Sequence, residues 1–194
     1  ETTPSLLTFD EFTTFLHEFG HALHGMLAKG EYESMNGTSV YRDFVELPSQ
    51  IMENWSLEPE MVRRYALHHR TNEPIPTHMI EKLQRSRHFN QGFNTVELLA
   101  ASLTDMDIHT IENYSPIDVN EFERKMLNER RGLMEQIAPR YRYPYFSHIF
   151  DGGYSSGYYS YLWAEVLDAD AFDAFKETGD IFNAEVAEKF RKYI

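Results

Sequence analysis

The 194-residue sequence predicts a mostly α-helical fold with a small β-hairpin or short sheet near residues 31–41. Two observations predict the helices. Apolar side chains recur at helical spacing in segment after segment, and prolines and glycines gather in the breaks between those segments. Residues 31–41 lack that period, and their aromatic and β-branched side chains around Gly37 favour a strand pair. The alternative for this segment is a plain surface loop.

The first predicted helix covers about residues 8–28. Thr8 is its N-cap and Glu11 follows three residues later, which is the pattern of a capping box. Its predicted core face carries Phe12, Phe15, Phe19, Leu23 and Met26. In the second predicted helix, at about 43–57, Pro48 must either open the helix or kink it. Further helices are predicted at about 59–70, 77–90, 94–113, 119–133, 154–176 and 183–194, with breaks at 72–76, 136–144, 152–153 and Gly179.

The first helix contains a motif with the spacing of metal ligands, His-Glu-x-x-His at residues 17–21. At 3.6 residues per turn, His17 and His21 lie one above the other on one face, where two neutral imidazoles can bind one zinc ion. Glu18 lies beside them and can take a proton from a zinc-bound water, whose pKa falls toward about 7. A chance occurrence of the motif in a helix is the alternative. His24 continues this face and is expected to be a packed histidine, not a ligand.

A catalytic zinc site usually has three protein ligands, and the chain contains no cysteine. Glu46 is the best candidate for the third ligand, because it lies among apolar residues on a helix that can return across the first. Glu53, two turns further on, or Asp43, nearly one turn before, could hold a ligating histidine through its other ring N–H. The alternative is that these acids are solvated surface charge.

A tyrosine-rich segment follows the glycine pair at 152–153. In the helix predicted at 154–176, Tyr154, Tyr158 and Tyr161 occupy positions i, i+4 and i+7, which is one stripe of hydroxyls. A neutral phenol can donate a hydrogen bond to a developing oxyanion. The alternative is an aromatic stripe that belongs to the core.

Together these segments resemble the thimet oligopeptidase family of zinc metallopeptidases. The matching residues are His-Glu-Phe-Gly-His at 17–21, Phe-Val-Glu-Leu-Pro-Ser-Gln at 44–50, His-Ile-Phe-Asp-Gly-Gly-Tyr at 148–154 and Gly-Tyr-Tyr-Ser-Tyr-Leu-Trp at 157–163. Within the family, residues 42–46 and 139–142 look most like the bacterial peptidyl-dipeptidases. The resemblance implies a multi-helix zincin-like catalytic domain that hydrolyses short peptides and releases C-terminal dipeptides.

The resemblance also implies a role for each matching residue. The zinc ligands would be His17, His21 and Glu46, holding one Zn²⁺ ion. Glu18 would be the general base and then the proton donor to the leaving amine, and Glu53 would support the ligands.

The other implied roles concern the substrate. Tyr161 and Tyr154 would stabilise the oxyanion and hold the substrate, and His148 would hydrogen-bond the substrate backbone. We also expect Tyr158 and Gly153 to bind substrate.

Family members are several-fold longer than this chain. Residues 1–194 are therefore expected to form a single catalytic domain from the C-terminal part of a longer peptidase, without its N-terminal lobe and its extreme C-terminus. The missing lobe is then a partner of this chain, and short peptides are its substrates. A net charge of −13 argues against nucleic-acid and anionic-membrane partners. We expect a cytoplasmic protein, with the periplasm as the alternative.

Two rival functions remain at this point. One is an oligoendopeptidase of the same family, which would cut internal peptide bonds. The other is a non-catalytic helical metal-binding module. Structural zinc sites are usually closed by four protein ligands, and only three strong candidates occur here, which favours a catalytic site. A strand pair at 31–41 would also offer an edge on which an extended peptide could bind.

Overall fold

The computed structural model describes residues 4–113 and 115–193, and it confirms that the fold is mostly helical. The chain forms two compact units. The first unit comprises Glu1–Phe89 and Ala164–Ile194, and the second comprises Asn90–Trp163. Helix α9, Ser160–Lys176, begins in the second unit and continues in the first. Among the described residues, none of the helices combines the length and the apolar character that a membrane span needs.

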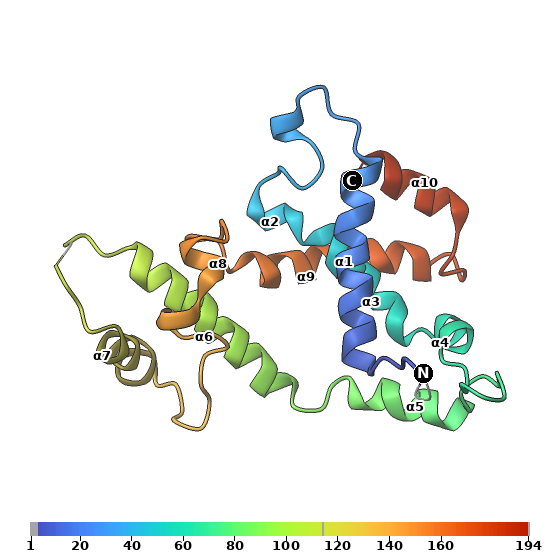
Figure 1. The fold of residues 1–194 in the computed structure, drawn as a ribbon, viewed down its shortest axis with the longest axis horizontal. Coiled ribbons are helices and arrows are strands. Elements are labelled where there is room, and N and C mark those ends of the chain that lie inside the picture. The colour runs from blue at the N-terminus through green and yellow to red at the C-terminus, as the bar shows by residue number, and fades with distance from the viewer. Residues whose placement is uncertain (1–3, 114, 194) are drawn as a thin grey trace. The chain divides into compact units, whose positions relative to one another are not determined.

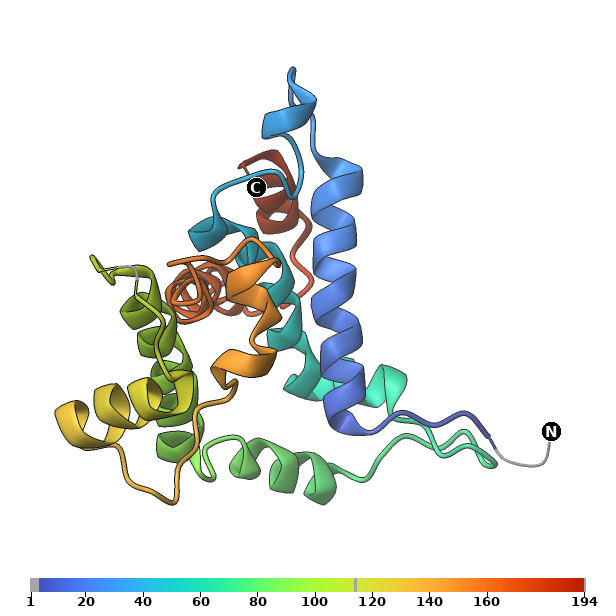
Figure 2. The same ribbon diagram turned by 60° about the vertical axis from the view of Figure 1, so that its left-hand side comes forward.

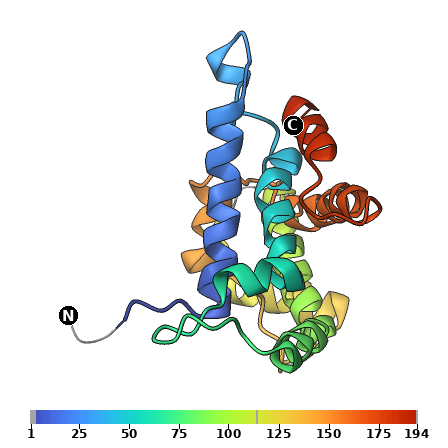
Figure 3. The same cartoon turned by 90° about the vertical axis from the view of Figure 1, so that its right-hand side faces the viewer.

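In the first unit, helix α1 (Phe9–Leu27) packs along helix α3 (Leu47–Asn54), and the two run in opposite directions (Figures 1 and 3). The predicted capping box is confirmed. The Glu11 N–H donates to Thr8 Oγ1 at 3.2 Å, and the Thr8 N–H donates to Glu11 Oε2 at 2.7 Å. Pro48 lies in the first turn of α3, so it opens that helix and does not kink it.

Gly20 sets how closely α1 and α3 approach each other. A methyl group at this position would overlap the carbonyl oxygen of Pro48 and lie only 2.5 Å from the Cα of Ser49. Because glycine has no side chain, the backbone of α3 can rest directly on α1 at this point. This contact brings the start of α3 next to the histidine face of α1.

The rest of the first unit surrounds this pair of helices. Ile51 of α3 forms a core cluster with Phe172 and Phe175 of α9, and the indole of Trp55 packs edge-on against both rings. The other helical elements are α2 (Arg42–Val45), η1 (Glu33–Met35), η2 (Trp55–Leu57), α4 (Pro59–Tyr65), α5 (Thr77–Ser86) and α10 (Ala184–Tyr193).

The second unit is built on helix α6, Gln91–His109. The α7 helix (Val119–Arg124) continues into a π-helical turn, η3 (Lys125–Glu129), which packs against α6 (Figure 2). Two short elements follow, η4 (Tyr143–Tyr145) and α8 (Ser147–Phe150). The core of this unit contains Ala101, Phe146, Ile149, Tyr154 and Tyr158.

The predicted β-hairpin at residues 31–41 is wrong. Within the described residues no strand forms, and this segment is a surface loop that contains the 3₁₀ turn η1. The side chains of Tyr32 and Met35 are 60% and 67% exposed, so their spacing does not reflect a half-buried sheet face. The loop is closed by the side chain of Asn36, whose Oδ1 accepts the Gly30 N–H at 2.8 Å. The proposed strand edge for an extended peptide is therefore absent too.

Two helix predictions need correction. The helix predicted at 154–176 begins only at Ser160, because turns occupy the residues before it and Ser156 adopts a left-handed φ of 54°. The predicted core face of α1 is also rotated. Phe15, Phe19 and Met26 are 56%, 41% and 68% exposed. The buried residues are instead Leu16, Gly20 and His24, on the side where α1 meets α3.

Candidate functional site

Three side chains of the first unit converge as the sequence predicts. The Nε2 atoms of His17 and His21 each lie 3.3 Å from Oε2 of Glu46. The histidines share a face because they are one turn apart on α1, and Glu46 joins them from the junction between α2 and α3, where only 1% of it is exposed. Among the described residues, these three form a group whose ligand atoms all lie within 4.8 Å of one another.

The spacing of these atoms fits a tetrahedral zinc ion. Ligands about 2.0–2.1 Å from such an ion lie about 3.3–3.4 Å from each other. The two distances of 3.3 Å between Glu46 Oε2 and the imidazole nitrogens match this value. Two imidazoles and one carboxylate are also a donor set that zinc prefers. The geometry and the chemistry of the group therefore both suit one zinc ion.

The electrostatics of the group favour a positive charge at its centre. Burial alone lowers the pKa of His17, but the hydrogen bonds with Glu46 and Glu53 outweigh it and raise the pKa to about 9. The cluster thus holds a proton strongly when no other cation is there. A divalent ion would replace the proton on Nε2 and bind Glu46, while Glu53 would still accept from Nδ1 of the same ring.

Glu53 holds His17 in place, and Ser49 holds Glu46. The Nδ1 of His17 donates to Glu53 Oε1 at 2.6 Å, which turns Nε2 of the same ring toward Glu46. Of the two acids considered for this position, Glu53 makes the contact, whereas Asp43 is half-buried and not among the residues that meet the histidines. Ser49 was missed by sequence reasoning. Its hydroxyl donates to Glu46 Oε2 at 3.0 Å, and its i+3 spacing from Glu46 could have revealed it.

The two remaining residues of the motif region differ in exposure. Glu18 is exposed on α1, immediately after His17, so its carboxylate can meet solvent and substrate. His24 is 7% exposed and its ring packs edge-on against Phe44, with the ring centroids 6.3 Å apart. The expectation that His24 is a packed histidine fits this environment. Burial, with a smaller contribution from the charge of His21, lowers the pKa of His24.

In the second unit, the predicted substrate-binding residues form one aromatic group. The ring centroid of Tyr161 lies 5.5 Å from that of Tyr154 and 5.0 Å from that of Tyr158. The imidazole of His148 lies 5.6 Å from Tyr158 and 6.1 Å from Tyr154. Tyr154 and Tyr158 belong to the core of this unit, so the alternative of an aromatic core describes their burial, whereas Tyr161 is half-buried.

The glycine pair before Tyr154 is required by the local backbone. A side chain at Gly152 would lie 2.8 Å from the Cα of His148. Gly153 has a φ of 80°, which lies in the left-handed region that disfavours other residues. This tight turn lets the Tyr154 N–H donate to the carbonyl of His148 at 2.9 Å, which ties the tyrosine segment to α8.

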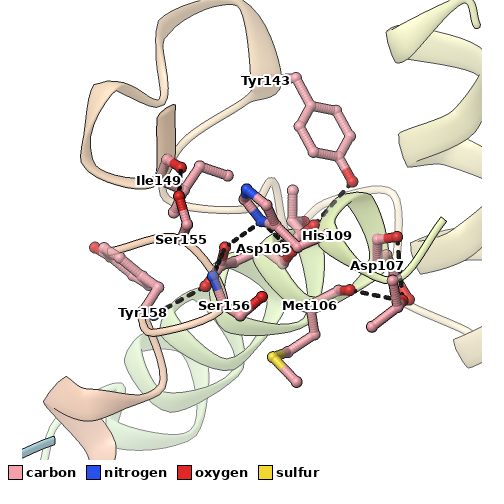
Figure 4. Close-up of polar contacts among 11 residues, drawn as sticks. Asp105, Met106, Asp107, His109, Tyr143, Ile149, Ser155, Ser156 and Tyr158 are labelled. Carbon is pink, nitrogen blue, oxygen red and sulfur yellow. Dashed lines mark hydrogen bonds and ion pairs between the residues drawn. The ribbon is translucent and has the colours of Figure 1, made fainter. Parts of the chain in front are cut away.

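A third feature of this unit was not found from the sequence. The carboxylate of Asp105 on α6 is fully buried and accepts hydrogen bonds from the tyrosine segment (Figure 4). Its partners lie far along the chain and are backbone N–H groups, which leave no signal in a sequence pattern.

Known proteins resemble this chain over nearly its whole length. Dipeptidyl carboxypeptidase of Escherichia coli is 43% identical over 179 residues, which are 92% of this chain and 26% of that protein. Oligopeptidase A of Salmonella typhimurium is 40% identical over 190 residues, 96% of this chain and 28% of that protein. Saccharolysin of Saccharomyces cerevisiae is 32% identical over 192 residues, 98% of this chain and 27% of that protein.

The chain thus spans about a quarter of the length of the curated relatives it matches. The model of peptidase family M3 matches residues 1–194, the whole of the sequence. The matched region includes the His17, His21 and Glu46 group and the tyrosine segment of the second unit. From this match and from the relatives, the chain belongs to peptidase family M3.

Proposed function

We propose that this chain is the catalytic part of a zinc metallopeptidase that hydrolyses short peptides and releases C-terminal dipeptides. The observation that carries the proposal is the 3.3 Å approach of Glu46 Oε2 to both imidazole nitrogens, because that is the edge length of a tetrahedral zinc site. His17, His21 and Glu46 would hold the ion. A zinc ion so held supplies a Lewis acid that polarises a carbonyl and lowers the pKa of water to about 7.

The proton transfers are assigned to Glu18. Its exposed carboxylate beside His17 accepts the proton of the attacking water and then delivers it to the leaving amine. General acid–base catalysis of this kind contributes about 10²–10⁴-fold to a rate. Glu18 is suited to this role because it adjoins the ligands and is not one of them.

Substrate contacts are assigned to the second unit. The hydroxyls of Tyr161 and Tyr154 donate to the oxyanion, and His148 donates to the substrate backbone. Tyr158 and Gly153 complete the substrate site. The support for these roles is the sequence motif that these residues share with the family, together with their grouping around one aromatic cluster.

We further propose that the substrate channel is completed by polypeptide outside these 194 residues, including an N-terminal lobe. The relatives are about four times longer than the region they share with this chain. The stacked rings of Phe15 and Phe19 on α1 are also well exposed, and a longer polypeptide would cover them. A cytoplasmic location is part of the proposal, and its support is the name of one relative, the probable cytosolic oligopeptidase A of Arabidopsis thaliana.

The second candidate is an oligopeptidase that cuts internal bonds, which the name oligopeptidase A of several relatives favours. Matched peptides with free and amidated C-termini separate the two. A peptidyl-dipeptidase of the proposed type needs the terminal carboxylate and should not cleave the amidated peptide. Equal cleavage of both peptides would instead establish an endopeptidase, which cuts internal bonds.

The decisive test compares Glu18→Gln with Glu177→Gln, an exposed glutamate just after α9. Zinc content is measured by elemental analysis, and peptide hydrolysis is measured with and without a chelator in the polypeptide that includes the N-terminal lobe. We expect Glu18→Gln to keep its zinc and lose at least about 100-fold in kcat. The Glu177→Gln control should match the wild type. Hydrolysis that persists in Glu18→Gln would refute the assignment, and a wild-type protein that binds zinc but cleaves no peptide would instead be the non-catalytic metal-binding module.

A further inference from the structure

Asp105 is a buried carboxylate that holds the tyrosine segment by its backbone. It lies on α6 with 0% of its surface exposed. Its Oδ1 accepts the Ser156 N–H at 2.9 Å, and its Oδ2 accepts the Tyr158 N–H, also at 2.9 Å (Figure 4). Each oxygen therefore binds one amide, and the two amides flank Gly157.

This arrangement explains why the segment is not helical. In a continuing helix the N–H groups of residues 156 and 158 would donate to carbonyls four residues earlier. Asp105 takes both of them instead. Ser156 is held at a φ of 54°, a conformation that residues other than glycine rarely adopt. Such a conformation persists when surrounding contacts fix it, and the two hydrogen bonds to Asp105 are those contacts.

The carboxylate is itself held rigidly. His109, one turn further along α6, forms a hydrogen bond between its Nδ1 and the backbone oxygen of Asp105 at 2.9 Å, and the same Nδ1 lies 2.8 Å from Oδ1 of the carboxylate. The residue before Asp105 is anchored as well, because Tyr143 donates its hydroxyl to the Thr104 carbonyl at 2.9 Å. Asp105 therefore has a fixed position on α6 when it binds the two amides.

The tethered segment carries the aromatic group described above. Tyr158 contributes one of the bound amides, and its ring lies 5.6 Å from His148 and 5.0 Å from Tyr161. A shift of this backbone would move these rings together. A charged side chain is costly to bury, and here its charge-assisted hydrogen bonds go to the loop backbone, so the loop geometry is what it stabilises.

We propose that Asp105 is a positioning residue for peptide hydrolysis, acting through the N–H groups of Ser156 and Tyr158 to fix the tyrosines that receive the substrate. This inference rests on the proposed function, because it needs Tyr161 to act in catalysis. Asp105 itself touches no substrate.

The test is Asp105→Asn in the complete polypeptide, with Asp107→Asn as the matched control. Asparagine keeps one acceptor oxygen but presents an NH₂ group to the second loop amide, so one hydrogen bond is lost and two donors face each other. We expect kcat to fall about 10- to 100-fold while zinc content stays at the wild-type level. Asp107 is also buried on α6, but it binds Arg131 and not the loop. Its variant should lose stability and retain kcat within about twofold at a temperature where it is folded.

A double-mutant comparison separates positioning from general weakening of the fold. If Asp105 acts through the tyrosines, adding Asp105→Asn to Tyr161→Phe should reduce kcat by less than about threefold, because the step it supports is already lost. A full additional 10-fold loss in that background would refute the inference. So would an unchanged kcat in the single Asp105→Asn variant.

Hydrogen exchange on the wild type covers the case in which Asp105→Asn does not fold. The amides of Ser156 and Tyr158 should exchange much more slowly than that of the exposed Ser155, and equal exchange rates would overturn the tether. Failure of the proposed function is seen separately. It would appear as a wild-type protein that cleaves no peptide or that is unaffected by chelator, whatever Asp105→Asn does.

Discussion

Gly20→Ala should open the contact between α1 and α3 and thereby dismantle the metal site without changing any ligand. The added methyl would lie 2.5 Å from the Cα of Ser49, whereas carbon atoms normally keep about 3.5–4.0 Å apart. The start of α3 must therefore retreat by roughly 1 Å. Zinc ligands tolerate deviations of only about 0.2 Å, so Glu46 would leave the reach of the two histidines.

The expected energies follow from the same displacement. Overpacking of this kind costs about 1–3 kcal/mol, and the better helix propensity of alanine offsets roughly 1 kcal/mol of it. Without zinc, the variant should lose about 0–2 kcal/mol in its free energy of unfolding. With zinc at about 1,000 times its Kd, the wild type gains about 4 kcal/mol that the variant lacks, so the difference between them should widen.

The assay is thermal and denaturant unfolding with and without zinc, together with zinc content by elemental analysis. Gly25→Ala is the matched control, because Gly25 is on the same helix and a methyl there meets nothing within 4 Å. It should keep its zinc and gain up to about 1 kcal/mol. Normal zinc binding by Gly20→Ala, or a stability deficit that is the same with and without the metal, would show that the helix contact does not control the site.

Three further predictions concern the same unit. Glu53→Gln should weaken zinc binding about 10- to 100-fold, because the partner that orients His17 loses its charge, and chelator competition measures this. Asp43→Asn is the control, and a matching loss there would contradict the assignment. Removing zinc with a chelator should lower the melting temperature and abolish hydrolysis, and re-added zinc should restore both. Asp168→Asn should change how stability depends on pH. Burial first, and then the charges of nearby acids, raise the pKa of Asp168 to about 6 against the opposing hydrogen bond from Asn54. The folded state of the wild type therefore binds this proton more tightly, and its stability falls as the pH rises from about 4 to about 6. Below about pH 4 the Asp168→Asn variant and the wild type should have the same free energy of unfolding. Above about pH 6 the variant should be up to about 3 kcal/mol more stable, as measured by unfolding at a series of pH values. Equal stability of the two proteins at pH 7 would show that folding does not raise the pKa of Asp168.

The sequence predicted those parts of the fold and of the site that depend on local signals. The capping box of α1 and the one-turn spacing of His17 and His21 are set within a few residues, and both lie where expected. Glu46 could be named because a carboxylate among apolar neighbours needs a partner. The roles of these residues in catalysis remain predictions.

The features that were missed depend on contacts between distant segments. The late start of α9 follows because Asp105 accepts hydrogen bonds from amides of the segment before it, and Asp105 is 51 residues from Ser156 in the chain. The rotated core face of α1 follows from the close approach at Gly20, which is a property of two backbones. At residues 31–41, the aromatic and β-branched side chains around Gly37 suggested a strand pair, but no strand forms among the described residues.

The proposed metal ligands come from both sides of the contact between α1 and α3, two from α1 and one from the residue that precedes α3. A bound ion would therefore act as a removable cross-link between segments that are separate in the chain. We expect local unfolding of the demetallated protein to begin where α1 contacts α3, which would expose Glu46 and the two imidazoles to water. Zinc supply would then control how long the protein survives proteases as well as how fast it works, and depletion would shorten its lifetime.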